Sequence, residues 1–250
     1  SNFGFNPKKL PHSLSLALGS GVVTPLQLAV GYSVFANGGY RVTPHFIDKI
    51  IENDQTVYQA NPVQACEACI TNPNLPAMRI PQPAAPRVIT SQNAYLVTSA
   101  LQSVIQDGTG RAAKVLGRTD LSGKTGTTND KIDAWFSGFN SKIVTTVWVG
   151  FDNLQSLHEY GAQAALPIWI DYMRDALKGT PESAMAQPPD IVTVRIDPRN
   201  GELARAGSKR AIFEVFREQY EPHRFSQARP RVRIRQDSKL ILHEGMPGEL

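Results

Sequence analysis

The segment Lys124-Thr125-Gly126-Thr127-Thr128 carries the residue types in this sequence that are best suited to chemistry. On a strand, the hydroxyls of Thr125 and Thr127 point to the same side and can hold a carboxylate. Gly126 lets a ligand backbone approach closely, and Lys124 adds a positive charge. Unpaired strand N–H groups can pair with an extended peptide and polarise its carbonyl. The segment therefore predicts a site for a peptide with a free C-terminal carboxylate, able to stabilise an oxyanion.

Two other interpretations of the glycine-rich segments are less favoured. Gly123-Lys124-Thr125 resembles the end of a phosphate-binding loop, but that motif needs a glycine at position 118, where the chain has Arg118. Gly108-Thr109-Gly110 is more typical of a turn than of a phosphate site. The five histidines are scattered without metal-ligand spacing, so no metal site is predicted.

The elements that must position the segment mix helices with hairpins and show no βαβ alternation. This predicts an α+β fold, an antiparallel β-sheet covered by helices. Capping and apolar spacing predict helices that begin at Thr24-Pro25, at Thr90-Ser91 and at Ala164. Turn residues and β-rich runs predict one hairpin around Asn53-Asp54 and another with strands at 132–139 and 142–151.

The helix predicted over 164–177 carries an apolar face. The residues expected on this face are Trp169, Tyr172, Met173, Ala176 and Leu177. We expect that face to cover the sheet.

The amino-acid composition excludes several classes of protein. With 250 residues, 41% hydrophobic and 19% charged, the chain can bury a sizeable core and is not mainly disordered. A net charge of +4 is far below that of a dedicated nucleic-acid binder, so no nucleic-acid partner is expected. No run reaches the roughly 18 apolar residues of a membrane helix.

Proline-rich stretches indicate a domain boundary. Pro181, Pro188 and Pro189 predict a linker that separates a main domain at 1–180 from an accessory, β-rich region at 181–250. Within that region, arginines alternate with other residues over 229–235, which favours a solvated strand face over a docking face for an anionic polymer.

Several spaced motifs follow one another in order over roughly residues 10–178. They are Thr24-Pro25-Leu26, Phe35-Ala36-Asn37-Gly38-Gly39, Asp107-Gly108-Thr109-Gly110, Lys124 to Thr128, Ala134-Trp135-Phe136, Val147 to Asp152 and Pro167-Ile168-Trp169. In these motifs the chain resembles the bifunctional class A penicillin-binding transpeptidases. The resemblance implies the penicillin-binding protein and serine β-lactamase-like fold, of which these residues would form the C-terminal portion.

The resemblance also implies an activity: serine acyl transfer from D-Ala-D-Ala stem peptides of peptidoglycan, with β-lactams as inhibitors and no cofactor. Lys124 would add positive potential and hold the family's Ser-x-Asn element, and Thr125 and Thr127 would grip the carboxylate. The N–H of Thr127 would be an oxyanion donor and Gly126 would give clearance, with Thr128 ending the substrate-binding segment. The parent protein would be membrane-anchored at its N-terminus, face the periplasm from the inner membrane, and also be a glycosyltransferase.

The family's nucleophile motif Ser-x-x-Lys occurs nowhere in the 250 residues. The single Ser-x-Asn match, Ser91-Gln92-Asn93, lies at an expected helix start, and we interpret Ser91 as a cap. We therefore expect an upstream segment with the nucleophilic serine as a partner. Two alternatives stay open: a D,D-carboxypeptidase or β-lactamase-like hydrolase, and a non-catalytic interaction module of the same fold.

Cys66 and Cys69 form a Cys-x-x-Cys pair, which suits a redox pair, half a zinc site or a disulfide. No further cysteine or nearby histidine completes a zinc site, and the βαβ context of a redox motif is missing. Because cell-wall enzymes work where disulfides persist, we expect a local disulfide that pins the proline-rich loop.

Overall fold

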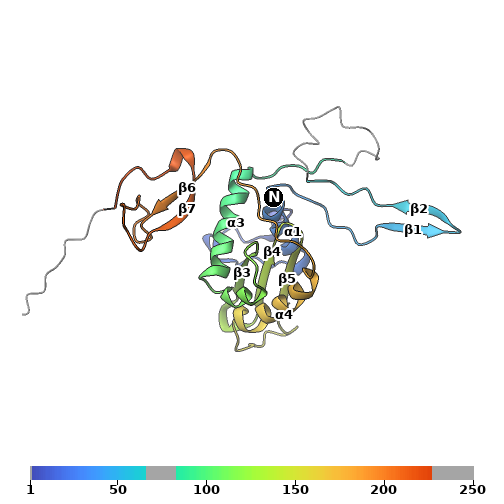
Figure 1. The fold of residues 1–250 in the computed structure, drawn as a ribbon. Helices are drawn as coiled ribbons and strands as arrows, with labels where there is room; N and C mark the ends of the chain where they lie inside the picture. The colour runs from blue at the N-terminus through green and yellow to red at the C-terminus, as the bar shows by residue number, and fades with distance from the viewer. Residues whose placement is uncertain (1, 66–82, 227–250) are drawn as a thin grey trace, which may run out of the picture. The chain divides into compact units, whose positions relative to one another are not determined.

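The computed structural model describes residues 2–65 and 83–226 (Figure 1). Contacts divide the chain into two units. The larger unit runs to Thr193 and includes Val215–Glu221, and the smaller comprises Val194–Glu214 and the chain from Pro222. The expected boundary at 180/181 stays a prediction. Among the described residues, no helix has the length and apolar character needed to cross a membrane.

Helices and strands alternate irregularly along the chain. The α-helices are α1 (Pro25–Ala36), α3 (Ser91–Gln106) and α4 (Gly161–Ala176). The strands are β1 (Lys49–Glu52), β2 (Gln55–Gln59), β3 (Ser122–Thr127), β4 (Ala134–Phe139), β5 (Val144–Val149), β6 (Ile191–Ile196) and β7 (Ile212–Arg217). Short 3₁₀ helices lie at Pro7–Lys9, Leu14–Leu18, Arg111–Leu116, Asn129–Lys131 and Glu218–Tyr220.

The central sheet is antiparallel, in the order β3-β4-β5. The predicted hairpin of β4 and β5 is confirmed. Its turn is closed by Asn140, whose side chain accepts the N–H groups of Lys142 and Ile143 at 2.9 Å each. Trp135 lies directly opposite Trp148, with ring centroids 6.1 Å apart. The aromatic pair stabilises the register of the two strands.

The helices expected at Thr24-Pro25 and Thr90-Ser91 begin there, whereas α4 begins at Gly161, three residues before the expected Ala164. The Thr24 side chain accepts the N–H of Gln27, and the Gln27 side chain accepts the N–H of Thr24, which forms a capping box. The cap of α3 is Thr90, which accepts the N–H of Asn93 at 3.2 Å. Ser91 is therefore the first helical residue and not the cap, because only the residue before the helix can turn its oxygen onto these N–H groups.

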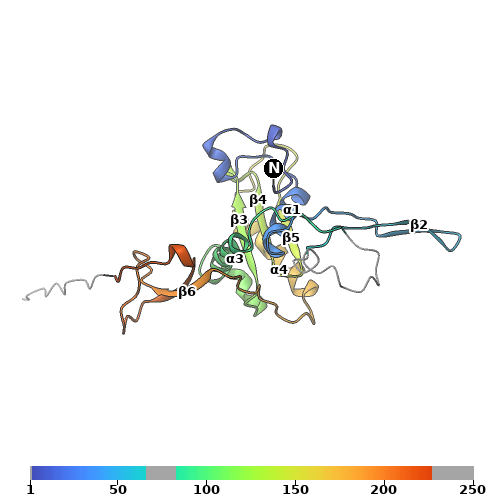
Figure 2. The same cartoon turned by 90° about the horizontal axis from the view of Figure 1, so that it is seen from above.

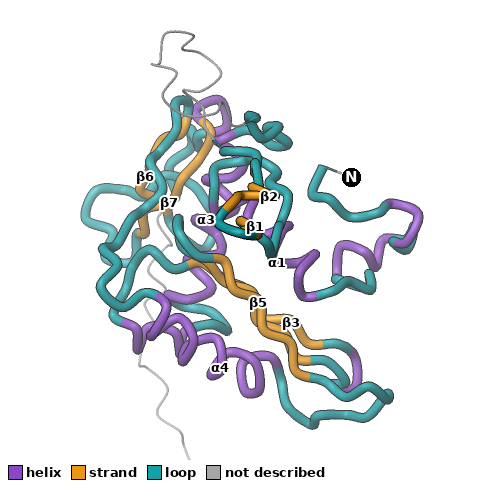
Figure 3. Tube along the Cα trace, turned by 90° about the vertical axis from the view of Figure 1, so that its right-hand side faces the viewer, coloured by secondary structure: helices purple, strands orange, loops and turns teal. Residues whose placement is uncertain are grey.

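Helices cover both faces of the sheet, as the α+β prediction required. On one face, Trp169 of α4 packs on Phe136 at 4.9 Å between ring centroids, and both rings are fully buried. On the other face, Tyr32 of α1 contacts Phe139 at 6.2 Å. Figure 3 shows α4 on one side of the strands and α1 and α3 on the other, and Figure 2 shows α3 next to β3.

The buried face of α4 differs from the expected one at two residues. Trp169, Met173 and Leu177 are buried, but Ala176 is half-buried and Tyr172 is 54% exposed. Helical positions 169, 173 and 177 follow a spacing of four and point at the sheet, whereas Tyr172 lies about 100° around the helix from Met173, toward solvent. The aromatic ring of Tyr172 suggested that this residue would be buried, but the orientation of α4 turns it toward solvent.

The predicted hairpin of β1 and β2 is confirmed. Asn53 and Asp54 have φ values of 47° and 60°, the left-handed conformation that a two-residue turn requires. Its strands are exposed along their whole length.

The smaller unit contains a turn at Asp197-Pro198-Arg199-Asn200-Gly201, in which the N–H of Gly201 donates to the carbonyl of Asp197 at 2.9 Å. The Asp197 carboxylate accepts hydrogen bonds from the Arg199 side chain and from Ser226. The bonds from Arg199 come first among the causes that hold the pKa of Asp197 well below its usual range. The alternating arginines at 229–235 lie outside the described residues.

Candidate active site

The predicted site segment lies on β3, which pairs with β4 alone among the strands that the structure describes. Thr128 donates its N–H to the carbonyl of Asp133, at the end of this ladder. Because hydrogen bonding alternates along an antiparallel strand, the N–H groups of Thr125 and Thr127 point away from β4. The outer edge of β3 therefore offers main-chain donors to an extended peptide.

Thr125 and Thr127 share one face of the sheet, as predicted. Their cross-strand neighbours are Phe136 and Ala134. Gly126 between them lies opposite Trp135, and a β carbon at Gly126 would stand 3.0 Å from the β carbon of Trp135. A side chain here would push against the indole, so glycine keeps β3 close to β4.

Lys124 is exposed and lies beside the hydroxyls. Its Nζ donates to the carbonyl oxygen of Thr125 at 3.0 Å and to Thr125 Oγ1 at 3.3 Å. The ammonium group therefore places a positive charge within hydrogen-bond distance of one of the two hydroxyls. That arrangement suits an anionic ligand group.

The Thr127 hydroxyl is held by the start of α4. Gly161, the first residue of this helix, donates its N–H to Thr127 Oγ1 at 3.0 Å. A β carbon at Gly161 would lie 2.4 Å from the carbonyl oxygen of Gly126 and 2.5 Å from that of Trp135. Only glycine allows the helix to come this close to β3, and the positive end of the helix dipole then lies at the site.

Thr128 turns away from the strand edge into a tight loop. Its hydroxyl accepts the N–H of Asp133 at 2.8 Å. Asp133 in turn accepts a hydrogen bond from the indole N–H of Trp148 at 2.8 Å. These bonds shape the end of β3, and a direct contact between Thr128 and substrate remains a prediction.

Thr109 is a residue near the site that sequence reasoning assigned only to a turn. The turn is present, and Thr109 Oγ1 lies 2.8 Å from Thr125 Oγ1. The signal that could have found it is the Gly-Thr-Gly motif ahead of Lys-Thr-Gly, but spacing along the chain does not reveal contact.

The base of β3 is anchored by a buried ion pair. Arg118 donates to both oxygens of Asp120, at 2.9 Å and 2.7 Å, and the Asp120 side chain is 1% exposed. Asn140 and the N–H of Ser183 donate to the same carboxylate at 3.1 Å each. Burial alone would raise the pKa of Asp120, but these hydrogen bonds outweigh it and the pKa is lowered. The pair ties the start of β3 to the β4–β5 turn.

The remaining sequence candidates lie elsewhere. Ser91-Gln92-Asn93 forms the first turn of α3, where Asn93 accepts a hydrogen bond from Arg217 at 2.8 Å. Cys66 and Cys69 lie outside the described residues. Within the described ranges, 2–65 and 83–226, no group of three metal-ligating side chains comes together.

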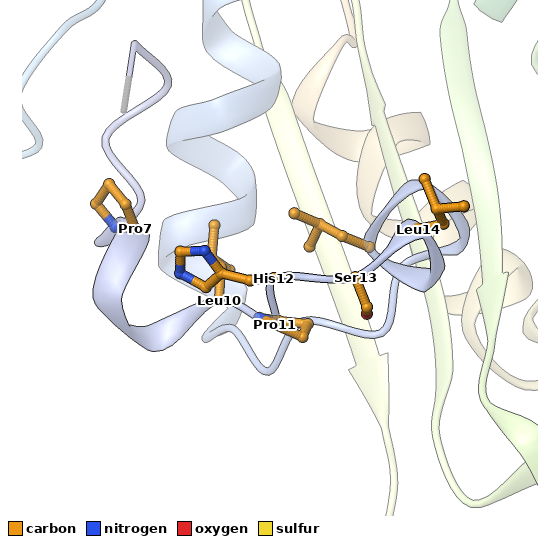
Figure 4. Close-up of a pocket in the computed structure, with 7 residues that line it drawn as sticks. Pro7, Leu10, Pro11, His12, Ser13 and Leu14 are labelled. Atoms are coloured by element: carbon orange, nitrogen blue, oxygen red, sulfur yellow. The ribbon is translucent and has the colours of Figure 1, made fainter.

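An apolar hollow near the N-terminus contains none of the predicted site residues (Figure 4). Its lining residues are Pro7, Leu10, Pro11, His12, Ser13, Leu14 and Leu16. The hollow is therefore separate from the chemistry expected at β3.

Comparison with known proteins identifies the family of the chain. The family described as the penicillin binding protein transpeptidase domain matches residues 1–174, and the chain belongs to this family. Its relatives include proteins named Penicillin-binding protein 1A. The one from Pseudomonas aeruginosa is 46% identical over 89% of this chain and 31% of its own length. The one from Neisseria gonorrhoeae is 47% identical over 76% of this chain and 22% of its own length.

A solved structure shows the same fold. The crystal structure of Penicillin-Binding Protein 1A from Haemophilus influenzae superposes with a TM-score of 0.79 at 36% identity. The match covers 90% of this chain and 36% of that one. The chain thus spans about a third or less of the relatives it matches.

Proposed function

We propose that this chain is part of a peptidoglycan D,D-transpeptidase that works by serine acyl transfer. One observation carries the proposal: the edge of β3 that faces away from β4 presents the N–H of Thr127 beside two hydroxyls and the ammonium group of Lys124. This set of donors suits a peptide that ends in a carboxylate and reacts through an oxyanion.

The reaction would proceed in two steps. A serine on a segment outside these 250 residues attacks the carbonyl carbon of the penultimate D-Ala, and the terminal D-Ala leaves with a proton on its nitrogen. An amine of a neighbouring stem peptide then attacks the acyl-enzyme, forms the new amide and releases the serine. In both steps the N–H of Thr127 would stabilise the negative carbonyl oxygen.

The carboxylate of the substrate would be held by the hydroxyls of Thr125 and Thr127, with Lys124 supplying the opposite charge. A β-lactam carries a carboxylate near its reactive carbonyl and would bind the same groups. The fit of stem peptides and β-lactams to one set of donors supports both as partners. A membrane-anchored parent that faces the periplasm and also polymerises glycan remains part of this proposal.

Substitution of Lys124 by alanine in the full-length protein tests the proposal. If Lys124 stabilises the charge that develops during acylation, labelling by a fluorescent penicillin should slow by about two to three orders of magnitude. Lys178→Ala removes another exposed lysine and should label at the wild-type rate. Equal rates for wild type and Lys124→Ala would remove Lys124 from the mechanism.

A product assay separates transfer from hydrolysis. With a D-Ala-D-Ala stem peptide and an amine acceptor, a transpeptidase forms the cross-linked amide as D-Ala is released. Release of D-Ala without amide formation would favour a carboxypeptidase. No release and no penicillin labelling would favour a non-catalytic module.

A further inference from the structure

The turn that follows α3 brings a third hydroxyl to the site. Thr109 Oγ1 lies 2.8 Å from Thr125 Oγ1, although the two residues are 16 positions apart. Thr109 is exposed and Thr125 is half-buried. Thr109 thus contacts the Thr125 hydroxyl from a turn that lies outside β3.

The fold holds this turn in place. The N–H groups of Gly108 and Gly110 both donate to the carbonyl of Val104, at 3.1 Å and 3.0 Å. A β carbon at Gly108 would lie 2.9 Å from Val104 Cα, so the tight exit from the helix requires glycine. Two turns earlier in α3, the carbonyl of Thr98 accepts a hydrogen bond from the hydroxyl of Ser122 of β3 at 3.2 Å. This bond fixes α3 against β3. Because the turn with Thr109 begins at the end of α3, the bond also fixes where Thr109 lies relative to β3.

The donors and acceptors around Thr125 limit what its hydroxyl can do. Thr125 Oγ1 has one proton and two lone pairs. Lys124 Nζ donates to one lone pair. If the Thr109 hydroxyl donates to the second lone pair, the proton of Thr125 stays available for a carboxylate. If Thr125 donates its proton to Thr109 instead, that proton is no longer available. Without a ligand, either of the two hydroxyls can be the donor. A bound anion favours the first arrangement because it needs the Thr125 proton.

The second hydroxyl of the site is held in the same manner. Thr127 Oγ1 accepts the N–H of Gly161, so its own proton is also left for a ligand. A hydroxyl that accepts a hydrogen bond becomes a stronger donor. Both threonines of β3 thus have a partner outside the strand.

We propose that Thr109 is a positioning residue, which donates to Thr125 and directs the Thr125 proton toward the carboxylate of the bound substrate. The proposal rests on the proposed function above. It assigns no contact between Thr109 and the reacting atoms, and it makes the effect of Thr109 depend entirely on the hydroxyl of Thr125.

Acylation of the full-length protein by benzylpenicillin, and by its neutral methyl ester, tests this dependence. Thr109→Val should lower the second-order acylation rate for the free acid by about three- to tenfold, the effect of one hydrogen bond. Thr109→Ser should restore most of that rate. The methyl ester should react with Thr109→Val and wild type alike. Thr56→Val, the same change on the exposed strand β2, is the matched control.

The double variant gives the sharpest result. If Thr109 acts only through Thr125, the combination Thr109→Val with Thr125→Val should react as slowly as Thr125→Val alone. The proposal is overturned if Thr109→Val matches wild type while Thr125→Val is slow. It is also overturned if the two losses multiply, or if the methyl ester is affected equally. Absence of labelling in wild type, or no effect of Lys124→Ala, would instead refute the proposed function.

Discussion

Replacement of Gly161 by alanine tests whether the start of α4 must touch β3. The added β carbon would lie 2.4 Å from the carbonyl oxygen of Gly126 and 2.5 Å from that of Trp135. Ordinary van der Waals contact begins at 3.4 Å. Both obstacles are main-chain atoms in the central sheet, so the helix start has to retreat by about 1 Å.

The consequences follow from that displacement. The distance from Gly161 N to Thr127 Oγ1 would grow from 3.0 Å to about 4 Å, beyond a hydrogen bond. Overpacking costs about 1–3 kcal/mol of folding free energy, and the lost hydrogen bond adds about 0.5–1.5 kcal/mol. Since Thr127 would supply both a hydroxyl and an oxyanion donor, we expect acylation to slow by at least about tenfold.

The assay combines thermal unfolding with the time course of fluorescent penicillin labelling, both on the full-length protein. Ala162→Gly is the control, because it weakens the same helical turn by up to about 1 kcal/mol without adding an atom. It should lower the melting temperature slightly and leave labelling unchanged. Labelling of Gly161→Ala at the wild-type rate would contradict this prediction, and so would labelling of Ala162→Gly that is equally slow.

Two predictions concern parts of the chain outside the reacting groups. Because the pKa of Asp120 is lowered in the folded state, the stability it contributes is complete above about pH 4 and is lost as the pH falls further. Asp120→Asn should therefore lower the melting temperature at pH 7 and flatten its acid dependence; parallel melting curves for both proteins from pH 7 to pH 3 would contradict this. Cys66 and Cys69 should form a disulfide in protein taken from an oxidising compartment, and two alkylatable thiols in non-reduced mass spectrometry would refute it.

Helix starts and turns could be predicted because the interactions that form them are local. Thr24 and Thr90 each cap a helix by binding an N–H three residues ahead, and Asn53-Asp54 closes a two-residue turn. Such contacts depend on neighbouring residue types alone. The same holds for the two hydroxyls of Thr125 and Thr127, since alternation along any strand places them on one face.

The sequence by itself therefore determined the order of the elements, the strand that carries the Lys-Thr-Gly-Thr segment, and the residue types that this strand presents. Only the tertiary structure decided what surrounds those groups. Thr109 reaches Thr125 across 16 residues, and Gly161 reaches Thr127 across 34. Both contacts exist because α3 and α4 pack against the sheet at fixed distances, and packing depends on the shapes of all the contacting side chains together. No local pattern encodes such a distance.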